Sequence, residues 1–379
     1  MNPTDRSTPA VPGCIPAIGK EEIEAVADVL RSGWLAHGPK NHDFEKAFQA
    51  YLGVKHAITM NSCASALQVA VEMLGIQGEV ITPSFTFVAT VNAIVLAGAT
   101  PVFVDVDRDT RNMSASCIEA AITPQTEAIM VVHYAGLPAD MPTILAIARK
   151  HHLQVIEDSA ECLGGQYHGT FAGSETTGCF SFFPTKNIAT GEGGILTTND
   201  DDLARRVRGR IAHGIDSTTF AREKADKPWI RIASQPGYNF RMSNVLAAIG
   251  AEQMKKIDRL NAQRAERVAQ YRDELASVSQ VEFPCAPEGF VHSWQMLTVL
   301  VPPSTRDELL LALREKNIGV SVHFDPPVHK HPPYVDVRAG TDLKVTEELA
   351  ESIVTLPLYP DMRPEDVVYV CQAIRSFFK

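Results

Sequence analysis

The sequence predicts an α/β protein with a larger part built on a mainly parallel β-sheet and a smaller α+β domain at the C-terminus. From residue 57 onward, short apolar runs rich in valine and isoleucine alternate with segments at helical spacing. Continuous apolar strands that alternate with helices indicate a parallel sheet covered on both faces. Around residue 250 the pattern changes to a highly charged helix, so residues 1–249 and 250–379 are predicted to form two domains.

The elements of the larger domain follow from spacing and composition. A first helix is predicted over 20–31, where Ile23, Val26 and Leu30 share one face and Gly33 can end the helix. Apolar runs too short for buried helices predict strands over 57–60, 79–83, 101–107, 128–136 and 153–161. Helical spacing recurs between them, at 64–74 and 142–152.

The smaller domain is predicted to begin with a connector helix. One long charged helix is expected over 251–275, followed by an apolar run at 295–301. Two further helices are expected, in part of 306–316 and over 364–378. This mixture of helices and a few short apolar runs is typical of an α+β domain.

Charge and cysteine usage argue against several classes of protein. The 379 residues carry 35 lysines and arginines against 45 aspartates and glutamates, which gives a net charge of −10. Neither nucleic acid nor a membrane surface is an expected partner, because such binders cluster basic residues. The seven cysteines show no Cys-x-x-Cys spacing, so no metal site and no disulfide framework is expected. No apolar run of about 18 residues and no signal peptide is visible, which predicts a cytoplasmic protein.

Polar residues at strand ends are the candidates for chemistry, because ligands of parallel sheets bind at the carboxyl ends of the strands. Ser62 and Cys63 follow the first strand at the start of a helix, where backbone N–H groups can hold an anion; the alternative is a simple helix cap. Asp158 ends an apolar strand, where an unpaired carboxylate is costly, although a salt bridge would also explain it. His133 and Tyr134 follow another strand.

Lys186 lies in an unusual segment, FSFFPTKNIATGEGG (180–194), with few charged neighbours. A partly desolvated lysine can act as an amine nucleophile. Pyridoxal phosphate joins these parts, since it needs a Schiff-base lysine, an acid at its ring nitrogen and a phosphate cradle. Lys186, Asp158 and the turn at 61–63 supply them. Phe87 could stack on the ring, although core packing is its alternative role.

These motifs resemble the DegT/DnrJ/EryC1/StrS family of pyridoxal phosphate-dependent sugar aminotransferases, which have the type I (aspartate aminotransferase-like) fold. The resemblance extends from about residue 12 to the C-terminus. The matching stretches are SGWLAHGP (32–39), NSCASAL (61–67), PSFTFVATVNAI (83–94), GATPVFVDVD (98–107), HYAGLPADM (133–141), VIEDSAE (155–161), FSFFPTKN (180–187), TGEGG (190–194), GYNFRMS (237–243), VHFDPPVHKHPPY (322–334) and LPLYPDM (356–362).

The resemblance implies a role for each matched residue of the cofactor site. Lys186 would bind the cofactor covalently, Asp158 would pair with the ring nitrogen, and Phe87 would stack on the ring. The phosphate would be held by Ser62, Cys63, Ser181 and, from the neighbouring subunit, Asn239. The family therefore implies a homodimer with shared active sites.

The resemblance also implies residues that contact the substrate. It places Trp34, His323 and His329 around the sugar, with packing or surface placement as the alternative for the two histidines.

The sequence departs from the family pattern at two places. The residue three after the ring aspartate is usually His or Gln, near an oxygen of the cofactor ring, but here it is Glu161. The stretch GSETTGCFSF also lacks the Gly-Asp that many members carry before FSF, and nothing in the sequence explains that change.

The implied activity is transfer of an amino group from L-glutamate to a nucleotide-linked keto sugar. Members that act at C4 of an NDP-4-keto-6-deoxyhexose tend to carry PTKN followed by TGEGG, as here at 184–187 and 190–194. Amination at C3 and a non-catalytic ligand-binding protein are the alternatives. A sugar 3-dehydratase of the same family would carry histidine in place of Lys186.

Overall fold

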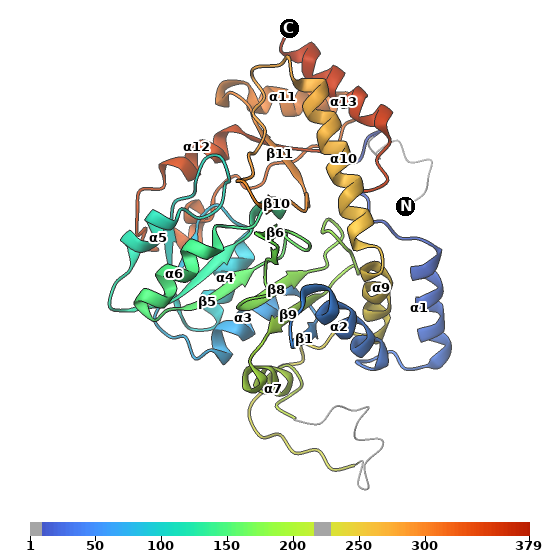
Figure 1. Ribbon diagram of the computed structural model, residues 1–379, viewed down its shortest axis with the longest axis vertical. Helices are drawn as coiled ribbons and strands as arrows, with labels where there is room; N and C mark the ends of the chain where they lie inside the picture. The colour runs from blue at the N-terminus through green and yellow to red at the C-terminus, as the bar shows by residue number, and fades with distance from the viewer. Residues whose placement is uncertain (1–9, 216–228) are drawn as a thin grey trace.

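The computed structural model describes residues 10–215 and 229–379 and confirms an α/β fold with a mainly parallel central sheet (Figure 1). Its strand order is β1-β9-β8-β5-β4-β2-β3, in which β9 runs antiparallel to both of its neighbours. The other pairs in this sheet are parallel. The strands span His56–Met60 (β1), Glu79–Pro83 (β2), Thr100–Val104 (β3), Thr126–Val132 (β4), Gln154–Asp158 (β5), Thr177–Ser181 (β8) and Gly194–Thr198 (β9).

All five predicted strands are present, but three of them end earlier than predicted. β3, β4 and β5 stop at Val104, Val132 and Asp158, and the residues after them form loops and turns at the sheet edge. One such turn is the 3-10 helix Tyr134–Gly136. β8 and β9 were not predicted, although β9 lies between β1 and β8 and joins them into one sheet.

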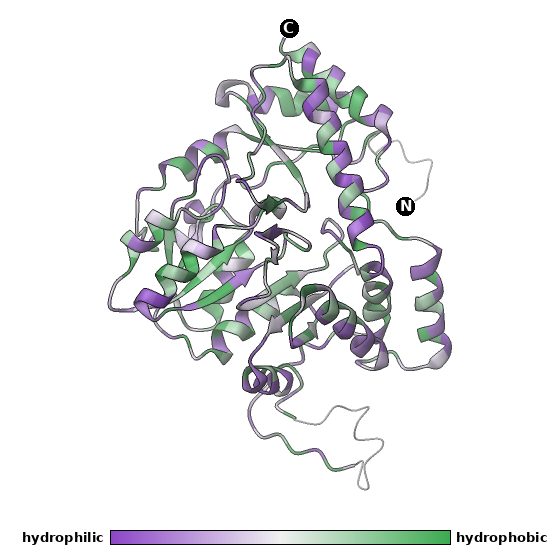
Figure 2. Ribbon diagram, in the orientation of Figure 1, coloured by the Kyte–Doolittle hydropathy of each residue, from purple (hydrophilic) through white to green (hydrophobic). Residues whose placement is uncertain are grey.

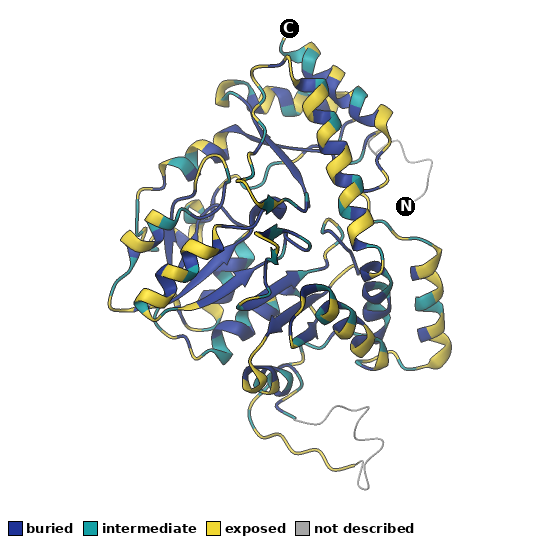
Figure 3. Ribbon diagram, viewed as in Figure 1, coloured by how far each residue is buried: buried dark blue, intermediate teal, exposed yellow. Residues whose placement is uncertain are grey.

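Helices cover both faces of the sheet, because alternate residues of each strand are apolar on opposite sides. Ile58, Val80 and Ile156 face a core shared with α3, α4 and α7. Residues next to them, such as Ile81 and Val155, face α5 and α6, while α2 and α9 cover the same face beside β1 and β9. Figure 3 shows the strands buried between helices whose outer sides are exposed. These helices are α2 (Pro39–Leu52), α3 (Cys63–Met73), α4 (Val88–Leu96), α5 (Ala115–Ala121), α6 (Met141–His151), α7 (Asp201–Arg210) and α9 (Asn244–Met254).

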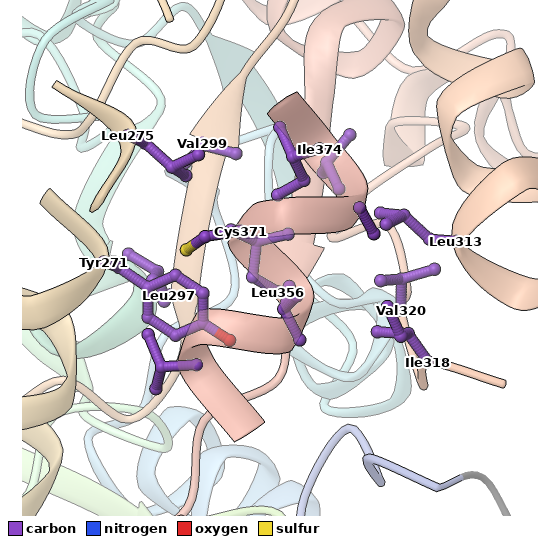
Figure 4. Close-up of a cluster of buried hydrophobic side chains, with 14 of the residues drawn as sticks. Tyr271, Leu275, Leu297, Val299, Leu313, Ile318, Val320, Leu356, Cys371 and Ile374 are labelled. Carbon is purple, nitrogen blue, oxygen red and sulfur yellow. The ribbon is translucent and has the colours of Figure 1, made fainter. Parts of the chain in front are cut away.

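The C-terminal part has a core of its own, which Figure 4 shows in close-up. Tyr271 and Leu275 of α10 pack there against Leu297 and Val299 of β11, and Cys371 of α13 lies among them. Val11 joins the same core, so the N-terminal segment crosses onto the C-terminal part. The elements are α10 (Ile257–Leu275), β11 (Leu297–Leu300), α11 (Pro303–Glu315), α12 (Lys344–Ser352), β12 (Ile353–Leu356) and α13 (Pro364–Phe377).

The prediction of one continuous helix over 251–275 is wrong. α9 ends at Met254, and α10 begins at Ile257 after a break at Lys256, whose backbone angles are non-helical (φ −127°, ψ 9°). α9 packs against α1 (Lys20–Ser32) and α2, whereas hydrophilic and hydrophobic residues alternate along α10 (Figure 2). The predicted domain boundary at 249/250 falls inside α9, and the division into two domains stays a prediction.

The first helix is present as α1 (Lys20–Ser32), but its predicted apolar face is not the one that packs. Ile23 and Leu30 are 64% and 57% exposed, while Val29 is buried. Glu22 is also buried, and its carboxylate pairs with Lys256, which lies between α9 and α10. Within 10–215 and 229–379, no helix combines the length and the apolar character that crossing a membrane requires.

Candidate active site

A cavity of about 760 Å³ opens at the carboxyl ends of the parallel strands, between the sheet and the C-terminal part. Eight of the residues predicted from the sequence line it. They are Ser62, Cys63, Phe87, Asp158, Glu161, Ser181, Lys186 and His323. The parallel sheet explains the convergence, because turns that follow parallel strands meet at one edge.

Ser62 both caps α3 and lines the cavity. Its side chain accepts a hydrogen bond from the Ser65 amide at 3.1 Å, and Cys63 begins the helix. Gly194 of β9 packs so closely here that a Cβ would lie 2.4 Å from the Ser62 carbonyl carbon. Burial raises the pKa of the Cys63 thiol well above its usual value, which keeps it neutral. The start of α3 thus presents a helix N-terminus to the cavity, and the neutral Cys63 thiol adds no negative charge to it.

Asp158 is the last residue of β5 and is only 5% exposed. Its carboxylate accepts hydrogen bonds from the Thr90 hydroxyl at 2.8 Å and from the Ala160 amide at 3.1 Å. Burial raises the pKa of Asp158 and the charge of Glu161 adds to the rise, while the two hydrogen bonds and the charge of Lys186 oppose it. Both hydrogen-bond donors are neutral, so this carboxylate would gain from a cationic partner in the cavity.

Lys186 has a charged neighbour that its sequence surroundings did not indicate. Its Nζ lies 3.2 Å from Glu161 Oε1, and the two side chains are 15% and 8% exposed. The other carboxylate oxygen of Glu161 accepts a hydrogen bond from the Ala135 amide at 3.0 Å. The expectation of a weakly charged environment for Lys186 is therefore wrong, since an acid from the turn after β5 reaches its amine.

Three further predicted residues complete the lining. Phe87 precedes α4 and is 59% exposed, so core packing does not account for it. Ser181 ends β8 and lines the cavity on the side of Lys186. His323 comes from the C-terminal part, where its Nδ1 is 2.8 Å from the Thr355 hydroxyl. Burial lowers the pKa of His323, which leaves its imidazole neutral at physiological pH.

The structure does not bring Trp34, Asn239 or His329 into this cavity. Trp34 donates its indole N–H to the His37 carbonyl at 3.1 Å. The exposed Asn239 accepts hydrogen bonds from the Arg241 guanidinium at 2.9 and 3.0 Å. His329 lies between the Ser84 hydroxyl at 2.7 Å and Glu347 at 3.1 Å, which fits its packing alternative.

Sequence reasoning missed several residues of the site. Thr90 donates a hydrogen bond to Asp158. It lies in the stretch PSFTFVATVNAI (83–94), but no pattern in that stretch indicates that this threonine contacts Asp158. Gln295 lines the cavity from the segment before β11 and follows no motif. The C-terminal wall is mostly apolar, and no pattern in the sequence marks it as part of a site. Its members include Met296, Val320, Val322, Phe324, Leu356 and Leu358.

Comparison with known proteins identifies the family. The model of the DegT/DnrJ/EryC1/StrS aminotransferase family matches residues 16–375. SpsC of Bacillus subtilis (strain 168), a spore coat polysaccharide biosynthesis protein, is 40% identical over 381 residues, which cover 97% of each chain. DesI, solved in the presence of its TDP-sugar product, is 30% identical with a TM-score of 0.87, over 97% of this chain and 93% of DesI. The PLP form of Spr1654 from Streptococcus pneumoniae, a putative sugar aminotransferase, is 26% identical with a TM-score of 0.89, over 97% of this chain and 98% of Spr1654. This chain is a member of the DegT/DnrJ/EryC1/StrS aminotransferase family.

Proposed function

We propose that this chain, a sugar aminotransferase by family, uses pyridoxal phosphate to move an amino group from L-glutamate to C4 of an NDP-4-keto-6-deoxyhexose. The observation that carries the proposal is one cavity that holds both the Lys186 amine and the buried Asp158 carboxylate. The TDP-sugar product of DesI and the PLP form of Spr1654 support the substrate class and the cofactor.

The residues in the cavity fit this cofactor. When bound, pyridoxal phosphate supplies an aldehyde that captures amines and a protonated ring that takes up electrons. Asp158, buried with neutral hydrogen-bond donors only, would pair with the ring N–H. The N-terminus of α3 with Ser62, together with Ser181, would hold the phosphate. Phe87, exposed at the rim, would cover the ring face.

Lys186 is the group that handles protons in this proposal. Its Nζ removes the proton from the carbon that carries the amino group and returns a proton to the carbon that receives it. Glu161 accepts a hydrogen bond from this amine and so keeps it inside the cavity rather than in solvent. The Ala135 amide fixes the other oxygen of Glu161, which limits the movement of the carboxylate.

The C-terminal wall orients the sugar. Val322, Phe324 and Leu356 give the cavity an apolar side, which suits the methyl group of a 6-deoxy sugar and excludes water. His323, neutral and held by Thr355, can offer a hydrogen bond to a sugar hydroxyl. The stretches PTKN and TGEGG support amination at C4.

A homodimer with shared sites completes the proposal. Asn239 lies on the surface of this chain and outside its own cavity, as expected of a residue that contacts the cofactor phosphate of a partner subunit. Trp34 and His329 also lie outside the cavity of this chain. We assign no sugar contact to His329, whose ring is held between Ser84 and Glu347.

A panel of nucleotide-linked 3-keto and 4-keto sugars, assayed with L-glutamate, tests the function. NMR should show the new amino group at C4 of a 6-deoxyhexose, with 2-oxoglutarate formed in equal amount. An amino group at C3 would overturn the assigned position. Binding of the sugars without 2-oxoglutarate formation, with the cofactor loaded, would favour a non-catalytic binding protein.

A further inference from the structure

The backbone around Lys186 belongs to no helix or strand, yet its carbonyl groups are held one after another by side chains from elsewhere. Gln295 Nε2 donates to the Thr185 carbonyl at 2.8 Å. Arg264 Nη2 donates to the carbonyls of Lys186 at 3.3 Å and Asn187 at 3.1 Å. Three consecutive peptide groups are therefore fixed by two side chains, and none of these bonds comes from the sheet that carries Asp158.

Both donors are part of the C-terminal half of the molecule. Arg264 lies on α10, and Gln295 lies in the segment that leads into β11. The same segment is tied to the other side of the site, because the Met296 amide donates to the Ala135 carbonyl and the Ala135 amide binds Glu161. Gln295 thus lies between two parts of the site: the loop that carries Lys186, and the turn whose Ala135 amide holds Glu161.

Stability alone does not explain why these residues are polar. Arg264 is 3% exposed and bonds to carbonyl and amide oxygens rather than to a carboxylate. Burial lowers the pKa of Arg264 to about 10, so a charge is kept in the interior at neutral pH. Among the residues that the structure describes, Arg264 Nε and Gln295 Oε1 are buried and have no hydrogen-bond partner. A buried unpaired polar atom costs free energy, and apolar side chains of similar size avoid that cost.

The orientation of the Gln295 side-chain amide follows from its hydrogen-bond partner. The Thr185 carbonyl can only accept a hydrogen bond, so the amide nitrogen of Gln295 must face it. A glutamate or methionine at this position could not make the bond. The Arg264 guanidinium likewise offers several donors in a planar fork, which a lysine cannot reproduce.

We propose that Gln295 and Arg264 are positioning residues for Lys186, because their hold on carbonyls 185–187 fixes where the Lys186 side chain enters the cavity. The proposal rests on the function proposed above for Lys186. A displacement of about 1 Å of a reacting group is enough to lower a rate by up to about 100-fold.

Hydrogen exchange on the cofactor-free protein tests whether Gln295 and Arg264 hold this loop, without any reaction. Gln295→Met should speed exchange of backbone amides in 182–190 by about tenfold, the effect of one lost neutral hydrogen bond. Arg264→Lys, which disturbs bonds from a charged donor to two carbonyls, should speed it at least as much. Matched controls lie on α10: Gln270 and Arg272 donate to the carbonyls of Pro364 at 2.9 Å and Pro284 at 2.8 Å. Gln270→Met and Arg272→Lys should leave this segment unchanged.

Kinetics of the loaded enzyme then tests the positioning role. Gln295→Met should lower kcat by roughly 10-fold to 100-fold, while the KM for the sugar changes less than about threefold. Gln295→His, which keeps a ring N–H donor, should recover part of the loss. Unchanged exchange in 182–190, or faster exchange with normal kcat, overturns the proposal. Borohydride labelling of a lysine other than Lys186 would overturn the proposed function instead, and would leave the exchange result standing.

Discussion

Lys186 Nζ and Glu161 Oε1 lie 3.2 Å apart in the cavity, although 25 residues separate them in the sequence. Each belongs to a different loop at the carboxyl edge of the sheet, and the Ala135 amide holds the far oxygen of Glu161 at 3.0 Å. Both side chains are largely buried, so solvent screens their interaction only weakly. Glu161 is therefore held on one side by the amine of Lys186 and on the other by a backbone amide of a neighbouring turn.

Lys186 should be the residue that carries the cofactor. Borohydride treatment of the loaded enzyme is expected to attach the cofactor to a peptide that contains Lys186, as peptide mass spectrometry would show. Lys186→Ala should lose activity by about 100-fold to 10,000-fold, because the proton carrier is removed. Attachment to another lysine, such as the exposed Lys255 between α9 and α10, would contradict the assignment.

Replacement of Glu161 by glutamine separates charge from shape. Glu161→Gln keeps an oxygen that can accept from Lys186 but loses the charge-assisted part of the bond. We expect kcat to fall on the order of 10-fold, since charged hydrogen bonds exceed neutral ones by about 1–2 kcal/mol. Glu192→Gln is the control, because Glu192 lines the same cavity, whereas the ion pair of Lys186 is made with Glu161. An equal loss in both variants would argue against a specific role for Glu161.

Asp158 should act mainly in the transition state. Asp158→Ala removes the counter-charge of the ring nitrogen, so kcat should fall far more than KM rises. The same change leaves the hydroxyl of Thr90 and the amide of Ala160 without their acceptor. Thr90→Val removes one of these hydrogen bonds but keeps the carboxylate, so steady-state kinetics of both variants separates the loss of the bond from the loss of the charge. Near-normal kcat for Asp158→Ala would show that the ring does not depend on this carboxylate.

The raised pKa of Asp158 also predicts that the stability of the cofactor-free protein depends on pH. Its pKa is raised on folding, chiefly by burial, so the folded chain favours the protonated acid. The stability from this group is present below the unfolded pKa and is lost as pH rises through the folded pKa. Asp158→Asn, which stays neutral, should therefore melt at a higher temperature than wild type at pH 7. The difference should vanish at acidic pH, and a difference independent of pH would point to another cause.

Asn239 should act across a subunit interface. Lys186→Ala and Asn239→Asp are each expected to be inactive as homodimers. If sites are shared, a mixed dimer holds one site with both defects and one intact site, so activity should return to about half per mixed dimer. Subunit exchange is verified by native mass spectrometry. Exchange without recovery, or full activity in a monomer, would exclude the shared site.

The sequence by itself determined the α/β class, the presence of five strands and candidate polar residues near the ends of some of them. Ser62 and Asp158 could be found because each follows a short apolar run, and strand ends of a parallel sheet converge by geometry. Lys186 stood out through its local composition, FSFFPTKN, and the family resemblance gave it a role. All of these signals lie within a few residues of the position they predict.

Only the tertiary structure decided which distant residues meet. Gln295 is 110 residues from Thr185, and Arg264 is 78 residues from Lys186, so no local pattern could place them on one loop. The exposed face of α1 and the break at Lys256 were likewise mispredicted. Hydrophobic periodicity reports that a residue can be buried but not against which element, because packing partners are chosen by the fold of the whole chain.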